Sequence, residues 1–205
     1  MPIEHVDAVL PYVLPPVAAM IELQRFTGMR PGEVVLMRNG DIDRTGSVWL
    51  YRPLHHKTEH HGHERVIAIG PRAQQVLTPW LQDDSDAPFF SPREAMKRKR
   101  AEMRAKRKTK VQPSQRNRRK KNPKRQPKEQ YTTHSFCYAV RRACEKAGVP
   151  VWHPHQIRHT RATELRERYG LDAARVILGH RSPRITETYA KLDLTKAIEI
   201  AATDG

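Results

Sequence analysis

One basic segment decides which parts of this 205-residue chain can form a core. Residues 93–128 hold 18 of the 38 Lys and Arg but only 2 of the 22 Asp and Glu, so the rest of the sequence has 20 of each and no net charge. The formal net charge of +16 therefore lies within this segment. Because the segment also has few large apolar residues, it cannot bury enough surface to fold by itself. We expect a single domain spanning 1–205, with a basic, flexible insert at 93–130.

Hydrophobic periodicity and turn residues predict a mostly helical α+β fold with a small antiparallel sheet. Glycine and proline mark the boundaries, with Gly28 ending a first helix and Pro31 opening the next. The expected elements are helices over 15–26 and from 31, strands over 48–51 and 65–69, and helices over 71–81, 94–108, 134–147, 155–168, 172–178, from 182 through Tyr189, and over 194–202.

Nothing in the sequence points to export or to a membrane. There is no run of about 18 apolar residues and no signal-peptide pattern at the start. Cys137 and Cys144 lie seven positions apart in an expected helix, roughly 10 Å along its axis, which is too far for a disulfide. Two free thiols suit a reducing cytoplasm, and we expect the protein to act there, close to the nucleoid.

Six dispersed residues have the side chains that phosphoryl transfer to a tyrosine requires. Two arginines can hold one phosphate, two histidines and a lysine can move protons, and a tyrosine can attack phosphorus. His155 and Arg158 lie three apart and therefore share a helix face, which is weak evidence alone. The sequence Leu178-Gly-His180 nine residues before Tyr189 strengthens it. The six residues are Arg30, Lys57, His155, Arg158, His180 and Tyr189.

These motifs resemble the tyrosine recombinases, the phage-type integrases. The arginine turn at 27–33, the hairpin pair Lys57-Thr58, the HxxR motif at 155–158, the LGH motif and the final tyrosine follow the order and approximate spacing of that family. The resemblance covers about 15–200, apart from the insert. The amino-acid sequences at 71–73, 91–94 and 149–158 most resemble those of integrases from planctomycete bacteria.

The resemblance implies a catalytic domain with a three-stranded antiparallel sheet that acts on DNA without a cofactor. Arg30 and Arg158 would clamp the non-bridging oxygens of the scissile phosphate. Tyr189 would attack phosphorus and form a 3′-phosphotyrosyl link. The N-terminal core-binding domain of the family is expected to be absent, because the arginine turn begins at Thr27.

The remaining family roles fall on four residues. His155 would deprotonate the tyrosine, Lys57 would protonate the departing 5′-oxygen, and His180 would hydrogen-bond the phosphate. Glu33 would orient the site without reacting. Without the resemblance, Lys57 reads as an exposed hairpin lysine.

Double-stranded DNA is the expected partner, bound by a homo-oligomer that exchanges its C-terminal helix. The same apolar residues of that helix fit equally well over the protein's own core. The insert reads as a solvated linker, as a binder of DNA phosphates, or as both; in the second case deleting it should flatten the salt dependence of binding. Candidate DNA contacts are Arg65, Lys97, Arg98, Arg100, Arg118, Arg119 and Lys120.

Three other readings stay open. Five histidines between His55 and His63 invite a metal site, although no CxxC or HExxH pattern accompanies them, and a DNA-facing hairpin fits them better. A type IB topoisomerase would use the same chemistry to relax DNA. A DNA-binding remnant that no longer cuts would retain the motifs without the reaction.

Overall fold

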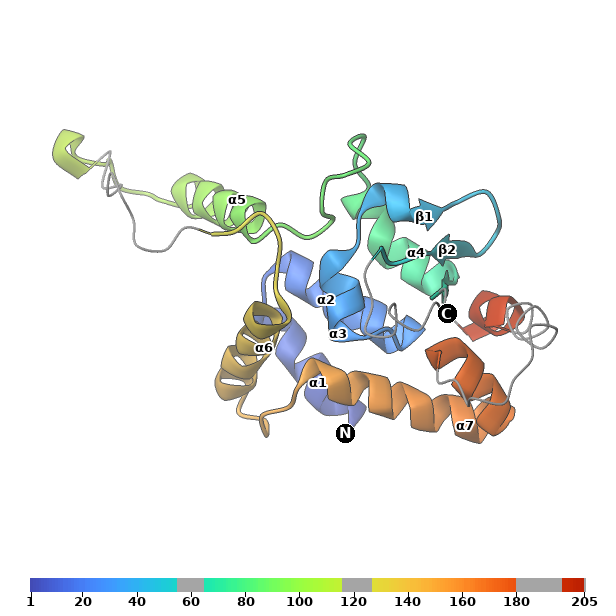
Figure 1. Ribbon diagram of the computed structural model, residues 1–205. Helices are drawn as coiled ribbons and strands as arrows, with labels where there is room; N and C mark the ends of the chain where they lie inside the picture. The colour runs from blue at the N-terminus through green and yellow to red at the C-terminus, as the bar shows by residue number, and fades with distance from the viewer. Residues whose placement is uncertain (55–64, 116–126, 180–196, 205) are drawn as a thin grey trace.

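The computed structural model describes residues 1–54, 65–115, 127–179 and 197–204 (Figure 1). These residues form a mostly helical fold with a three-stranded antiparallel sheet, which confirms the expected fold class. Within the described part of the chain, no helix is long and apolar enough to cross a membrane. Cys137 and Cys144 are both free thiols.

Helix α2 (Pro15–Thr27) is the centre of the first half of the chain. It follows α1 (Ile3–Val9) and a 3-10 turn η1 (Leu10–Tyr12), and it packs against both α4 and α7. The predicted helix over 15–26 is confirmed, and it ends where Gly28 takes φ 67°. A short α3 (Pro31–Leu36) follows, so α2 and α3 are separated by the arginine turn.

The sheet is small and lies beside α4. It consists of β1 (Ile42–Asp43), β2 (Trp49–Tyr51) and β3 (Ile67–Ile69), with β2 in the middle. The strands predicted at 48–51 and 65–69 are confirmed with tighter limits, and β1 completes the sheet.

Helix α4 (Pro71–Leu77) is shorter than expected. The prediction of one helix through Leu81 is wrong in its last turn, which is a 3-10 turn η4 (Thr78–Trp80). The reason is Pro79, because its ring has no N–H to donate and clashes with the carbonyl four residues earlier in an α-helix.

The basic insert begins with a helix that stands apart from the core. Helix α5 (Pro92–Ala105) projects from the body of the molecule (Figure 1), and Ala95 is its buried residue. The expectation of a solvated helix here is confirmed. Asn39–Asp41 and Pro113–Gln115 form further 3-10 turns, η2 and η5.

The last two helices are α6 (Thr133–Ala147) and α7 (Pro154–Leu178). Helix α7 contains a non-helical residue, Gly170 at φ 87°, so its two parts match the predicted helices 155–168 and 172–178. Residues 197–204 are helical and pack on α7 of the same chain, with Ile200 against Leu165 and Ala174. The predicted helix opening at Ser182 lies outside the described residues.

Candidate active site

The arginine turn between α2 and α3 is held by side-chain hydrogen bonds from α2. Gln24 Nε2 donates to the Met29 carbonyl at 3.0 Å, and the Met29 backbone N–H donates to Thr27 Oγ1 at 3.3 Å. Gln24 is fully buried. These hydrogen bonds fix the turn to α2. Arg30 is the last residue of the turn and directly precedes α3.

Glu33 holds both ends of Arg30. Its Oε2 accepts from the Arg30 backbone N–H at 2.6 Å, and its Oε1 accepts from Arg30 Nη1 at 2.8 Å. The Arg30 side chain keeps 22% of its surface exposed, whereas Glu33 is 2% exposed. Glu33 thus holds Arg30 from the buried side and leaves part of the Arg30 side chain exposed to solvent. This arrangement agrees with the predicted role of Glu33 in orienting the site.

Two further side chains fix Glu33 itself. The buried hydroxyl of Tyr51 on β2 donates to the Glu33 carbonyl at 2.8 Å, and Arg65 Nε donates to Glu33 Oε1 at 3.2 Å. Burial by itself raises the pKa of Glu33, but Arg65 and Arg30 outweigh it, so the pKa lies below its ordinary value. Glu33 is therefore ionised at neutral pH.

Arg158, in the first half of α7, links this helix to the arginine turn and to the end of α7. Its Nη1 donates to the Gly28 carbonyl at 2.8 Å and its Nη2 to the Leu178 carbonyl at 2.6 Å. Arg158 is 3% exposed. Burial, followed by the nearby charges of Arg30 and Arg65, lowers the pKa of Arg158 to about 10, so its guanidinium is charged at neutral pH. Each terminal nitrogen of a guanidinium carries a second hydrogen, so Arg158 has the capacity to donate beyond these two carbonyls.

His155 lies one turn before Arg158 on α7, on its exposed side. Its ring makes an edge-to-face contact with His159, with centroids 4.9 Å apart and planes at 78°. His159 is not among the residues predicted from the sequence, although its spacing of four residues from His155 places both on one face of the helix. The helix thus turns Arg158 inward and His155 outward.

Three of the six predicted residues, Lys57, His180 and Tyr189, lie outside the described residues. So do the histidines of 55–63 and the candidate contacts Arg118, Arg119 and Lys120. The described chain resumes at Arg65 after the hairpin and stops at Gly179 before residue 180. In the ranges that are described, no three His, Cys, Asp or Glu side chains are grouped closely enough to hold a metal ion.

Two features of Gly179 disfavour any other residue at this position. It ends α7 at φ 65°, and a Cβ there would lie 2.3 Å from Arg65 Nη1. Gly148 ends α6 at φ 70°, but its Cβ would have no neighbour within 4 Å. Gly148→Ala and Gly179→Ala therefore share the backbone strain and differ in the clash.

Urea unfolding of these two variants measures the clash. We expect each to lose about 1 kcal/mol of unfolding free energy from the left-handed backbone. Gly179→Ala should lose a further 1 to 3 kcal/mol, roughly, because Arg65 has to move. Equal losses in the two variants would mean that Arg65 does not pack against the end of α7.

We call Arg30, Arg65 and Arg158, together with Glu33, the arginine cluster. The candidate DNA contacts on α5 are far more open to solvent than this cluster. Lys97, Arg98 and Arg100 are exposed, and the Arg98 guanidinium lies 6.0 Å from the Trp80 ring centroid. Arg65, which the sequence suggested as another contact, is 7% exposed and paired with Glu33.

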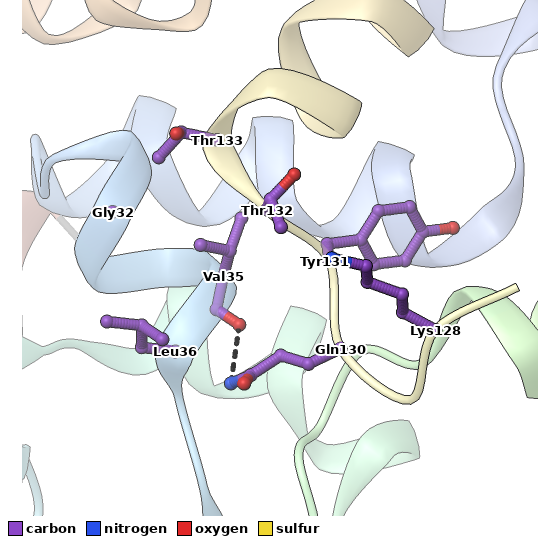
Figure 2. A pocket seen from close by; sticks show the side chains of 8 residues that line it. All are labelled: Gly32, Val35, Leu36, Lys128, Gln130, Tyr131, Thr132 and Thr133. Atoms are coloured by element: carbon purple, nitrogen blue, oxygen red, sulfur yellow. Dashed lines mark hydrogen bonds between the residues drawn. The ribbon is translucent and has the colours of Figure 1, made fainter.

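A cavity of about 370 Å³ lies between α3 and the segment leading into α6 (Figure 2). Val35 and Leu36 face Thr132 across it, and Gln130 Nε2 donates to the Val35 carbonyl at 3.1 Å. Its lining is largely apolar and includes no member of the arginine cluster. None of the described residues predicted for catalysis lines this cavity.

Two solved structures share the fold of this chain. A crystal structure of XerA recombinase has a TM-score of 0.54 at 16% identity, covering 96% of this chain and 62% of that one. XerH site-specific recombinase, in a pre-cleavage complex with its difH substrate, has a TM-score of 0.55 at 16% identity, covering 95% of this chain and 48% of that one. This chain thus spans less than two thirds of either recombinase.

The amino-acid sequence was also compared with protein families and with curated proteins. No curated protein matches the chain, and the narrower resemblance to planctomycete integrases stays a prediction. The model of the phage integrase family matches residues 15–196, a range that contains the arginine turn, α7 and all six predicted site residues. The chain therefore belongs to the phage integrase family.

Proposed function

We propose that this chain is the catalytic domain of a site-specific DNA recombinase that breaks and rejoins DNA through a 3′-phosphotyrosyl intermediate. The observation that carries the proposal is the convergence of Arg30 and Arg158, from segments 128 positions apart, around the ionised Glu33. Paired guanidinium groups bind the two non-bridging oxygens of a phosphodiester and stabilise the charge that builds on them in the transition state.

The reaction is an exchange of one phosphate ester for another. Tyr189 Oη forms a bond to phosphorus while the bond from phosphorus to the 5′-oxygen breaks. His155, on the exposed side of α7, takes the tyrosine proton, and Lys57 gives a proton to the 5′-oxygen. His180 hydrogen-bonds the phosphate. Because the ester energy is kept in the tyrosyl link, rejoining needs neither ATP nor a metal ion.

Double-stranded DNA and further copies of the chain are the proposed partners. XerH was captured on its DNA substrate, which supports DNA as the partner here. Residues 197–204 pack on α7 of their own chain, with Asp204 paired to Arg161 at 2.9 Å. Exchange of this helix would place the same contacts on the α7 of a neighbouring copy.

A covalent-capture experiment tests the proposal without knowledge of the target sequence. The protein is incubated with a pool of duplexes that carry a nick at a fixed position and random flanking bases, and covalent adducts are isolated under denaturing conditions and sequenced. We expect an enriched target and a phosphopeptide containing Tyr189, both absent in Tyr189→Phe.

Other outcomes identify the alternatives. Binding of DNA without an adduct would mean a non-cutting remnant. Adducts without sequence enrichment, together with relaxation of supercoiled DNA and no strand exchange, would mean a topoisomerase. Neither outcome is compatible with site-specific recombination.

The basic residues of α5 give a separate prediction for DNA affinity. If Lys97, Arg98 and Arg100 each neutralise a phosphate, replacing all three with Gln should reduce the slope of log affinity against log salt concentration by about 3. Fluorescence anisotropy across a salt series measures the slope. An unchanged slope would make α5 a solvated helix only.

A further inference from the structure

Arg65 is a buried cation that joins two parts of the candidate site. It is 7% exposed and lies just before β3. Its Nε donates to Glu33 Oε1 at 3.2 Å, and its Nη1 donates to the Ile177 carbonyl at 3.4 Å. One guanidinium therefore touches both α3, which carries Glu33, and the last turn of α7.

The contact with Glu33 changes how Glu33 holds Arg30. Oε1 of Glu33 accepts from Arg30 Nη1 at 2.8 Å and from Arg65 Nε at 3.2 Å, so two cations divide one carboxylate oxygen. Without Arg65, the whole negative charge of Glu33 would act on Arg30. Because opposite charges attract more strongly in a buried setting, Arg30 would then be drawn toward Glu33 and away from an incoming anion.

The charges of the cluster do not balance. Among the residues that the structure describes, the guanidinium groups of Arg30, Arg65 and Arg158 stand around the carboxylate of Glu33, which leaves two positive charges in excess within this set. In addition, Arg65 Nη2 is buried and has no hydrogen-bond partner among the residues that the structure describes. Unpaired buried donors are uncommon, and each calls for a functional explanation. Excess positive charge and an open donor both suit a phosphate anion.

Arg65 also lies against the end of α7. Its Nη1 is so close to Gly179 that a Cβ on that glycine would lie 2.3 Å away. Arg158 Nη2 donates to the adjacent Leu178 carbonyl at 2.6 Å. Two cations thus hold the last carbonyls of α7, which the helix dipole makes favourable acceptors.

We propose that Arg65 is a positioning residue of the phosphate site. By sharing Glu33 it keeps Arg30 available to a phosphate oxygen, and by bonding Ile177 it sets the end of α7 at the point where the chain continues to residue 180. This inference rests on the proposed function and adds to it a third arginine, one to which the recombinase resemblance assigns no catalytic role.

The first test uses inorganic phosphate and requires no DNA. Arg65→Gln is expected to raise the Kd for phosphate by about 10-fold, while Arg65→Lys, which keeps the charge, stays within about threefold of wild type. Arg141→Gln is the matched control, because Arg141 also forms a 3.2 Å ion pair, with Glu145, on the exposed face of α6. Phosphorus NMR titrations measure the Kd values, and urea unfolding confirms that each variant is folded. A Kd for Arg65→Gln within twofold of wild type, or no binding by either protein, would overturn the inference.

The second test measures cleavage on the duplex that the wild-type protein selects. With saturating DNA, single-turnover adduct formation should be at least about 10-fold slower in both Arg65→Gln and Arg65→Lys, because lysine cannot reach Glu33 and Ile177 together. The Kd for DNA should change little.

A substrate with a methylphosphonate at the scissile position distinguishes two causes of slow adduct formation in Arg65→Gln: misplaced positive charge and a general structural defect. This group has lost the negative oxygen charge, so the deficit of Arg65→Gln should shrink on it, whereas a general structural defect would slow both substrates equally. An Arg65→Lys protein that cleaves as fast as wild type would overturn the inference even if Arg65→Gln failed to fold. Absence of any adduct with the wild-type protein would reject the proposed function instead, and the phosphate titration would still decide the role of Arg65.

Discussion

Replacing Glu33 with Gln is expected to lower the free energy of unfolding by about 3 to 5 kcal/mol at pH 7. Gln keeps the shape of the side chain but removes the carboxylate that Arg30 and Arg65 share. Arg30, Arg65 and Arg158 would then stand close together without an anion, and a buried charge without a partner is strongly destabilising. Urea unfolding measures the loss.

The loss of unfolding free energy in Glu33→Gln should depend on pH in a definite direction. Because the pKa of Glu33 in the folded protein lies below its ordinary value of 4.5, its contribution to stability is complete above that value and is lost as the pH falls through the folded pKa. The stability difference between wild type and Glu33→Gln should therefore be constant from pH 7 to pH 5 and should narrow in stronger acid.

Glu145→Gln is the matched control for Glu33→Gln. Glu145 also pairs with an arginine at 3.2 Å, but it is 41% exposed. An exposed ion pair contributes roughly 0 to 1 kcal/mol, so this variant should be close to wild type. If Glu33→Gln were equally mild, Glu33 would not be the charge centre of the cluster.

Replacing Arg158 with Lys is expected to slow adduct formation by about 100-fold or more while leaving the net charge unchanged. The guanidinium spans the carbonyls of Gly28 and Leu178 at 2.8 and 2.6 Å and still has hydrogens for a phosphate. A lysine ammonium is a single point and cannot bridge both carbonyls and a phosphate at once. The arginine turn and the end of α7 would lose their link.

Single-turnover adduct formation on the selected duplex measures this effect. Arg161→Lys is the control, because Arg161 lies one turn further along α7, is 7% exposed, and makes ion pairs with Glu164 and Asp204 that an ammonium can keep. A large loss of rate in Arg161→Lys, or a small one in Arg158→Lys, would show that the fork geometry of Arg158 is not what the reaction needs.

Several parts of the site were readable from the sequence because they depend on neighbouring residues. Gly28 and Pro31 predicted the arginine turn, since a left-handed helix end and a first-turn proline are local requirements. The spacing of His155 and Arg158 predicted a shared helix, although one side chain faces outward and the other inward. Apolar spacing alone extended the predicted helix to Leu81, whereas Pro79 ends α4 at Leu77.

The role of Arg65 was not readable in that way. Its place beside the predicted hairpin suggested only a contact with DNA, whereas Arg65 is buried against Glu33, 32 positions earlier in the chain. Tyr51 was read only as part of a strand, and its hydroxyl fixes the Glu33 carbonyl. The contacts of Arg65 and Tyr51 with Glu33 depend on how the sheet packs against α3. The order of residues along the chain does not reveal that packing.

The sequence by itself determined most of the described helices and strands, the exposed helix α5 and the residue types that match the phage integrase family. Each of these follows from local backbone preference, from apolar spacing or from side-chain chemistry. Only the tertiary structure decided that Arg158 bonds Gly28 across 130 positions and that Arg30 and Arg65 share the carboxylate of Glu33. The physical reason is that burial brings like charges together only where packing of the whole domain outweighs their repulsion.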